Sequence, residues 1–238
     1  MRYATEIPAQ LWSAQEALQQ LDPLAASSQA IEFRESHWSR YLPADADLQV
    51  LCQSFPGALT RGDLAGLASM ARKESSPASA RRLFVGSMLW GYGTVGYGPY
   101  RTAKMLACSD SLDMLHATLI LLQDGRTAAA YERFRLPMCG PAFFTKFFYF
   151  VGLGCDSAHA PLILDSVVAN ALESELRVDI RRLARVTRDG SGRVSAVGRD
   201  ADGYMRYLEL LHTWADQLQC RPDSIELFLF TWQAASGA

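Results

Sequence analysis

The chain has 238 residues, of which 49% are hydrophobic and 20% charged, and its formal net charge is −2. This composition is ordinary for a globular protein, and the length suffices for one well-packed domain or two small lobes. A slightly acidic balance gives no support to nucleic-acid binding, which depends on cations that neutralise phosphates. No apolar run reaches the length of a membrane span and no signal-peptide core follows Met1, so we expect a cytoplasmic protein without a membrane partner.

Cysteine and histidine residues are dispersed, without the spacing of a zinc site or an iron–sulfur cluster. The odd number of cysteines indicates reduced thiols, most of them in the core. We therefore expect no metal and no cofactor. The residues concerned are Cys52, Cys108, Cys139, Cys155, Cys220, His37, His116, His159 and His212.

The first third of the chain predicts helices separated by turns. Apolar residues recur at helical spacing over residues 8–21, and Pro23 ends that helix. Shorter helices are expected over 43–52 and 63–73. Residues 74–80 (ESSPASA) have the composition of a linker.

The middle of the chain begins with a buried helix over residues 81–90. It ends in a loop, residues 91–100, in which four glycines alternate with aromatic residues. Such a loop either packs on its own tyrosines or presents them to a partner. Helices are expected to follow over 101–107, 109–122 and 126–135.

Residues 136–176 hold the most informative pair of side chains. Lys146, one of only three lysines, lies within an aromatic run over 143–150. Desolvation disfavours the charged form of a lysine, and the neutral amine is the nucleophilic form. A lysine in such a helix can instead extend its ammonium group to water. Asp165 follows an apolar stretch and precedes a helical one, so it is expected to cap that helix.

The last part of the chain combines an arginine cluster with two strong helices. Between residues 177 and 206 there are eight arginines and no lysine, which fits either a solvated surface or a DNA-facing patch. A short strand is expected over 193–197. Helices over 204–219 and 223–233 close the chain, and we predict an all-α fold.

Residues 140–146 (GPAFFTK) and 162–165 (LILD) resemble the helix-hairpin-helix DNA glycosylase superfamily, especially its compact bacterial 8-oxoguanine branch. In that family a Thr-Lys pair follows the hairpin, and an aspartate nineteen residues after the lysine opens a helix facing it. Thr145, Lys146 and Asp165 match these positions. The hairpin departs from the family's Gly-x-Gly pattern, because Pro141 after Gly140 lacks an amide hydrogen for a phosphate.

The resemblance covers about residues 81–233 and implies one glycosylase unit over residues 1–238. We expect a two-lobed helical bundle with a helix-hairpin-helix motif and the active-site cleft between the lobes. Lobe one is expected over about 81–164, including the hairpin 136–150. Lobe two is expected to combine about 1–80 with 165–238.

The resemblance also implies a bifunctional DNA glycosylase and abasic-site lyase. Lys146 would attack the anomeric carbon of a flipped nucleoside to form a Schiff base, with Asp165 stabilising the positive charge on the sugar. The implied partner is double-stranded DNA containing a modified purine such as 8-oxoguanine. We expect a monomer acting at the bacterial nucleoid, either in repair or in antiviral defence.

Further residues are assigned by the same resemblance. Candidate DNA contacts are Gly140, Thr145, Trp90, Tyr92, Tyr97 and Arg101. The candidate base pocket comprises Phe150, Glu226 and Phe230. Glu226 can accept hydrogen bonds from the donor edge of guanine. The alternatives are that Glu226 faces solvent and that Phe230 belongs to the core.

A second hypothesis is a catalytically silent helix-hairpin-helix module that binds DNA or a protein. The altered hairpin and the acidic balance favour it. Trapping of a Schiff base with borohydride separates the two hypotheses, because only the enzyme forms a covalent adduct with DNA.

Overall fold

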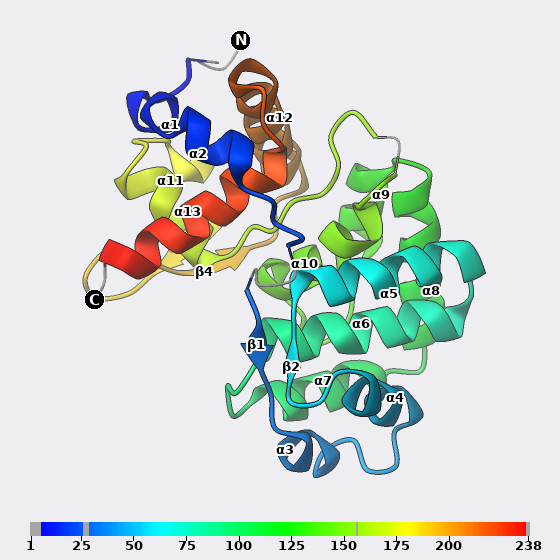
Figure 1. The fold of residues 1–238 in the computed structure, drawn as a ribbon. Coiled ribbons are helices and arrows are strands. Elements are labelled where there is room, and N and C mark those ends of the chain that lie inside the picture. Colours follow the sequence, from blue (N-terminus) through cyan, green and yellow to red (C-terminus); the bar gives the residue numbers. More distant parts are fainter. Residues whose placement is uncertain (1–5, 26–28, 156, 237–238) are drawn as a thin grey trace. The chain divides into compact units, whose positions relative to one another are not determined.

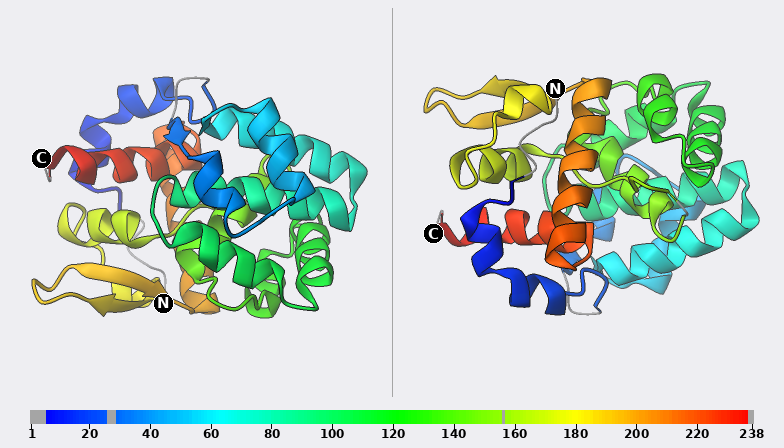
Figure 2. Two further views of the ribbon diagram at one scale, coloured as in Figure 1. Left: turned by 90° about the horizontal axis from the view of Figure 1, so that it is seen from below. Right: turned by 90° about the horizontal axis from the view of Figure 1, so that it is seen from above.

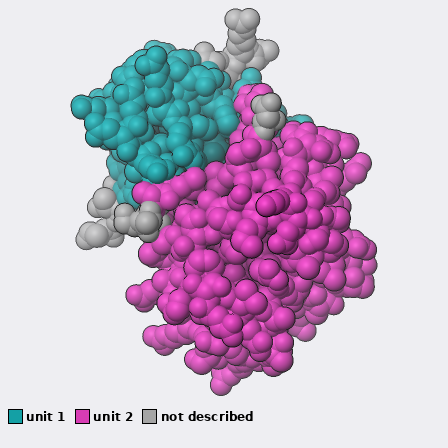
Figure 3. Space-filling model, turned by 45° about the vertical axis from the view of Figure 1, so that its right-hand side comes forward, with its two compact units in different colours: residues 1–23, 140–145, 161–238 teal, residues 24–139, 146–160 magenta. Residues whose placement is uncertain are grey.

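The structure, a computed structural model, describes residues 6–25, 29–155 and 157–236 and confirms the all-α prediction. Helices make up 61% of the structure, and the strands of the described residues form two short antiparallel pairs. Contacts divide the chain into two compact units (Figure 3). Unit 1 consists of residues 1–23, 140–145 and 161–238, and unit 2 of residues 24–139 and 146–160.

Unit 2 is built around helix α6 (Pro77–Tyr92), which α4, α5, α7 and α8 all contact (Figure 1). A two-stranded sheet, β1 with β2, also packs on α6, and its register pairs Ile31 with Leu59. The other elements of this unit are β1 (Ile31–Glu32), α3 (Glu35–Ser39), α4 (Ala46–Ser54), β2 (Ala58–Leu59), α5 (Arg61–Glu74), α7 (Gly98–Leu106), α8 (Ser111–Gln123) and α9 (Thr127–Arg133).

The stretch expected to be a linker, residues 74–80, comprises the end of α5, the tight turn at Ser75 and Ser76, and the start of α6. Ser75 adopts a left-handed backbone (φ 47°) that ends α5. Ser76 caps α6 in a reciprocal capping box with Ser79, and Pro77 occupies the first turn, where its missing amide costs nothing. Because the turn is so short, α5 lies beside α6, and residues 24–80 belong to unit 2. The expected lobes divide the chain differently, since they place residues 1–80 with the C-terminal helices.

The aromatic run fills the core of unit 2. It forms α10 (Pro141–Gly152), a continuous helix whose residues from Lys146 onward belong to unit 2. Phe147 and Phe148 pack edge-to-face against Phe84 and Phe134 with ring centroids 5.6 Å apart in each pair. This is the preferred geometry for buried aromatic rings.

Unit 1 combines C-terminal helices with the two N-terminal ones. α11 packs on α13, and α13 also contacts α2 and α12. Its elements are α1 (Ala9–Ser13), α2 (Gln15–Gln20), α11 (Ser166–Ser174), the 3₁₀ helix η1 (Ile180–Arg182), β3 (Arg185–Arg188), β4 (Val194–Gly198), α12 (Ala201–Leu218) and α13 (Pro222–Ser236).

The strand expected over residues 193–197 is confirmed as β4, which pairs with β3 in a hairpin beside α11 (Figure 2). Asn170 on α11 holds the start of β4, because its side-chain amide donates to the carbonyl of Val194 and accepts from the amide of the same residue, both at 2.9 Å. The hairpin is therefore fixed to the helix that begins after Asp165.

Among the described residues, no single helix has the length and apolar character needed to cross a membrane. Within the same described residues, α7 and α8 taken together reach this length and apolar character, but they meet at a bend of 92°.

Candidate functional site

The segment before Asp165 is extended, buried and anchored by two tyrosines. The hydroxyl of Tyr204 donates to the carbonyl of Leu162 at 2.8 Å, and that of Tyr207 to the carbonyl of Ile163 at 2.7 Å. Both tyrosines lie on α12, one turn apart, and their rings stack with centroids 6.0 Å apart. Buried backbone carbonyls need such partners when no strand supplies them. The two hydrogen bonds fix the path of the chain that leads to Asp165.

Thr145 supplies a third anchor for the same segment. Its hydroxyl donates to the carbonyl of Pro141 within α10 at 2.7 Å and accepts from the amide of Leu164 at 3.2 Å. The side chain is fully buried. Lys146 directly follows Thr145 in the chain, and Asp165 directly follows Leu164. Each candidate catalytic residue is thus the covalent neighbour of one member of this hydrogen-bonded pair.

Asp165 caps helix α11, as the sequence predicts. Its Oδ1 atom accepts from the amides of Val167 (3.0 Å) and Val168 (3.1 Å), and the residue is 8% exposed. A capping carboxylate also interacts favourably with the positive end of the helix dipole. The capping interaction therefore holds the carboxyl group in place at the start of α11.

Lys146 does not extend to bulk water, because only 7% of its surface is exposed. Its helix is held from α5 by Arg72, whose guanidinium donates to the carbonyls of Phe150 and Val151, each at 3.1 Å. These carbonyls lie at the C-terminal end of α10, where the helix itself provides no donors. Burial lowers the pKa of the Arg72 guanidinium from its usual range. Lys146 thus lies on a helix that is fixed at its C-terminal end.

The three residues expected to form a base pocket differ in exposure. Phe150 is fully buried in unit 2, edge-to-face with Trp90 at 5.5 Å. Glu226 on α13 is also fully buried, which excludes the alternative that it faces solvent. Phe230, one turn further along α13, is half-buried. A carboxyl group is retained in such a place only when it is hydrogen-bonded or paired.

The glycine–aromatic loop after α6 is partly packed on its own side chains. Trp90 and Tyr92 are 6% and 3% exposed, so these two expected DNA contacts lie inside unit 2. Gly98 lies so close to the Tyr92 ring that a Cβ atom there would come within 2.5 Å of it. Burial raises the pKa of the Tyr92 phenol. Tyr97 is 52% exposed, and the Arg101 guanidinium lies 4.5 Å from the centre of its ring.

Three exposed tyrosines and two cations form a surface that we call the tyrosine platform: Tyr41, Tyr97, Tyr100, Arg101 and Lys104. The rings of Tyr41 and Tyr100 meet edge-to-face at 6.0 Å, and the Lys104 ammonium lies 5.7 Å from the centre of the Tyr100 ring. α7 carries both cations and no acidic residue. Sequence reasoning missed Tyr41, which comes from a distant part of the chain, and Lys104 on α7. Tyr100 belongs to the glycine–aromatic loop that the sequence singles out, residues 91–100.

A family model described as "Putative 8-oxoguanine DNA glycosylase OGG-like protein" matches residues 24–230. The chain belongs to this family. No curated protein and no solved structure matches it. Membership of the OGG-like family confirms the resemblance at family level, and it gives the chain a DNA glycosylase-like role with DNA as the partner. The helix-hairpin-helix motif and the bacterial branch stay predictions.

The match to the OGG-like family includes all of the candidate site residues and the tyrosine platform. It also includes the arginine cluster, where several cations are already neutralised. Arg188 makes two hydrogen bonds with Glu173, at 2.6 and 2.7 Å, and Arg181 pairs with Asp179 at 2.9 Å. Paired arginines have less free charge for phosphates, so this part of the cluster fits the solvated-surface interpretation better.

The tyrosine anchors give a testable prediction about stability. Tyr204→Phe and Tyr207→Phe each leave a buried carbonyl without its donor, which should lower the free energy of unfolding by about 1–3 kcal/mol. In a chain of this size each kcal/mol corresponds to roughly 2–4 °C in melting temperature. Thermal unfolding followed by circular dichroism measures this, with the exposed Tyr41→Phe as control. Unchanged melting of the Tyr204→Phe/Tyr207→Phe double variant would contradict the anchoring role.

Proposed function

We propose that this chain is a bifunctional DNA glycosylase and abasic-site lyase that excises an oxidised or otherwise modified guanine from duplex DNA. The observation that carries the proposal is the buried Lys146 directly after Thr145, whose hydroxyl binds the segment that ends at Asp165. Membership of the OGG-like family supports the same reaction class.

Lys146 is the proposed nucleophile. The lone pair of its neutral Nζ forms a bond to C1′ of the flipped nucleotide as the bond between C1′ and the base breaks. The base leaves with the electrons of that bond and takes up a proton. Opening of the sugar ring converts the adduct to a Schiff base. Loss of a C2′ proton then breaks the C3′–O bond, which cuts the strand on the 3′ side of the abasic site.

Asp165 is proposed to stabilise the positive charge that develops on the sugar. A carboxylate held in a fixed position does this without reorganisation at the moment of reaction. Its hydrogen bonds with the amides of Val167 and Val168 support this role, since they fix one oxygen atom at the start of α11.

Glu226, Phe230 and Phe150 are proposed to receive the base. An ionised Glu226 accepts hydrogen bonds from the N1 and N2 donors of a guanine, and an aromatic ring stacks on the purine face. The position of Glu226 on α13 supports this assignment, because it lies four residues before Phe230 and therefore on the same face of the helix.

The tyrosine platform, together with Gly140 before α10, is proposed to contact DNA, whereas the fully buried Thr145 is proposed to position the segment that leads to Asp165. Exposed aromatic rings stack on bases and nearby cations bind phosphates. Tyr100→Ser should weaken binding of a fluorescent duplex by about three- to tenfold, whereas Tyr100→Phe, which keeps the ring, should not. Lys104→Gln should lower the slope of log affinity against log salt by about one. Equal binding by Tyr100→Ser and Tyr100→Phe would contradict the stacking role.

Borohydride trapping tests the reaction itself. The protein is incubated with duplexes containing 8-oxoguanine, an abasic site or no lesion, and borohydride reduces any Schiff base to a stable adduct. We expect adducts with the first two duplexes and none with the third. Absence of an adduct with both the damaged and the abasic duplex would overturn the proposal and support a catalytically silent DNA-binding module.

A further inference from the structure

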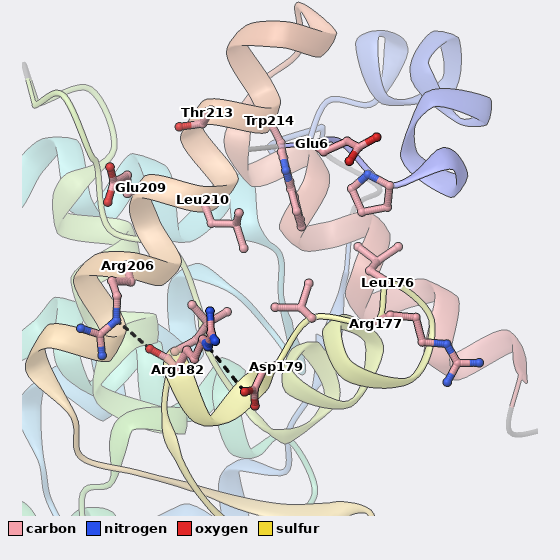
Figure 4. Close-up of a pocket in the computed structure, with 13 residues that line it drawn as sticks. Glu6, Leu176, Arg177, Asp179, Arg182, Arg206, Glu209, Leu210, Thr213 and Trp214 are labelled. Atoms are coloured by element: carbon pink, nitrogen blue, oxygen red, sulfur yellow. Dashed lines mark hydrogen bonds and ion pairs between the residues drawn. The ribbon is translucent and has the colours of Figure 1, made fainter. Parts of the chain in front are cut away.

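Unit 1 contains a pocket of about 530 Å³ between α12 and residues 176–183, the segment that follows α11 (Figure 4). We call it the α12 pocket. Its volume lies in the range of small-molecule binding sites. None of the residues assigned above to catalysis, the base or DNA lines it. The proposed excision reaction therefore gives this pocket no role.

The wall of the pocket on α12 is apolar and holds an unsatisfied donor. Leu210 and Trp214 extend from α12 toward the space, with Leu176 on the other side (Figure 4). Trp214 is only 2% exposed, and its indole Nε1–H has no acceptor among the described residues. A buried indole N–H normally finds a partner. The Nε1 atom itself is buried, so the ring contributes an apolar surface to the pocket.

Two arginines lie at one end of the pocket. The Nε of Arg206 donates to the backbone carbonyl of Arg182 at 2.8 Å, which fixes the plane of the Arg206 guanidinium. The terminal nitrogens of Arg206 have no partner among the described residues. Arg182 lies 3.6 Å from Asp179, whose carboxylate also accepts hydrogen bonds from Arg181. The hydrogen bond from Arg181 lowers the pKa of Asp179. A fixed guanidinium with free donors is suited to a carboxylate, phosphate or sulfonate.

The α12 pocket is lined by groups of both charges. Figure 4 shows Arg182 and Arg206 close to Asp179, Glu209 further along α12, Glu6 at another edge and Arg177 on the side of Leu176. An anionic group is attracted to Arg182 and Arg206, whose charge Asp179 offsets in part, and is repelled from Glu6 and Glu209. This arrangement orients a ligand so that its apolar part lies beside Leu210 and Trp214.

We propose that the α12 pocket binds a small amphipathic organic anion. Its acidic head group lies on Arg182 and Arg206, and its planar apolar body lies beside Trp214 and Leu210. This site is independent of the proposed excision chemistry, since it uses other residues.

The probe 1-anilinonaphthalene-8-sulfonate has this chemistry and becomes fluorescent in apolar surroundings. We expect the folded protein to bind it at one site with a Kd on the order of 10 µM. N-phenyl-1-naphthylamine has the same rings without the sulfonate, so it separates the apolar contribution from the charged one.

Matched variants locate the bound probe. Arg206→Gln and Arg182→Gln should each weaken the sulfonate probe by about tenfold and leave the neutral probe unchanged. Leu210→Gln should weaken both probes. Trp214→Phe, which keeps only part of the aromatic surface, should weaken both probes by a similar and smaller factor. Arg185→Gln is the control, because Arg185 is an exposed arginine on β3 in the same unit and does not line the pocket.

Three outcomes would overturn the proposal. One is absence of probe binding by the folded native protein. Another is an equal effect of Arg185→Gln and Arg206→Gln, which would indicate binding elsewhere. The third is displacement of the sulfonate probe by saturating undamaged duplex DNA, which would show that the arginines contact the phosphate backbone instead. The borohydride assay tests the excision proposal separately, so neither a positive nor a negative result there bears on probe binding to the α12 pocket.

Discussion

Replacement of Lys146 by glutamine is expected to abolish both base excision and the trapped adduct while the protein stays folded. Glutamine has a similar length but no nucleophilic amine, so neither the bond to C1′ nor the Schiff base can form. Loss of a nucleophile typically lowers the rate by a thousandfold or more. Single-turnover excision from an 8-oxoguanine duplex and borohydride trapping measure the two losses separately.

Lys73 provides the matched control for this experiment. It lies exposed on α5, so Lys73→Gln removes the same charge without touching the aromatic helix. Its excision rate should stay within about twofold of the native rate. Melting temperatures of both variants establish that they fold. Excision and trapping by a folded Lys146→Gln variant at native levels would remove Lys146 from the mechanism.

Local signals in the sequence predict much of the fold and part of the candidate site. Asp165 precedes a helical stretch directly, and the side chain caps that helix. The aromatic run around Lys146 predicts a buried helix, and Phe144, Phe147 and Phe148 are fully buried in the structure. In each case the residues that determine the outcome lie within a few positions of one another, so the pattern is visible without tertiary information.

Features that depend on distant contacts could not be predicted. Nothing near Tyr204 and Tyr207 indicates that their hydroxyls bind carbonyls more than forty positions earlier. Tyr41 joins Tyr100 on the tyrosine platform from the turn after α3. Residues 74–80 have the composition of a linker. In the structure, their serines cap the ends of two packed helices and Pro77 begins the second of them. Polar, small residues serve both purposes, so composition alone does not separate a linker from a tight turn.

The exposure of Lys146 also required the structure. A lysine has a long apolar stem, so a sequence of aromatic neighbours fits equally with a side chain that reaches water and with one that stays inside. An exposed fraction of 7% decides between these alternatives. A lysine is rarely buried to this extent, and buried ionisable groups are concentrated at functional sites.

Asp165→Asn is expected to separate the catalytic role of the carboxylate from its role as a cap. Asparagine is as good an N-cap as aspartate, so the amides of Val167 and Val168 keep their acceptor and the melting temperature should change little. The neutral amide cannot stabilise a positive sugar, so excision should fall by about a hundredfold or more. Asp165→Ala should lose activity to a similar extent and in addition about 1 kcal/mol of stability, because the cap is also removed.

Asp200 provides the control for Asp165→Asn and Asp165→Ala, because it is also a helix-capping aspartate. It caps α12 in the same unit by accepting from the amide of Gly203 at 2.8 Å, and no step of the proposed reaction uses it. Asp200→Asn should therefore keep both its stability and its excision rate. If Asp165→Asn behaves like Asp200→Asn under single-turnover conditions, the carboxylate at position 165 is a helix cap alone, and the charge on the sugar must be stabilised by another group. A loss confined to Asp165→Asn and Asp165→Ala would instead place the carboxylate in the reaction, since capping is preserved in the first and lost in the second.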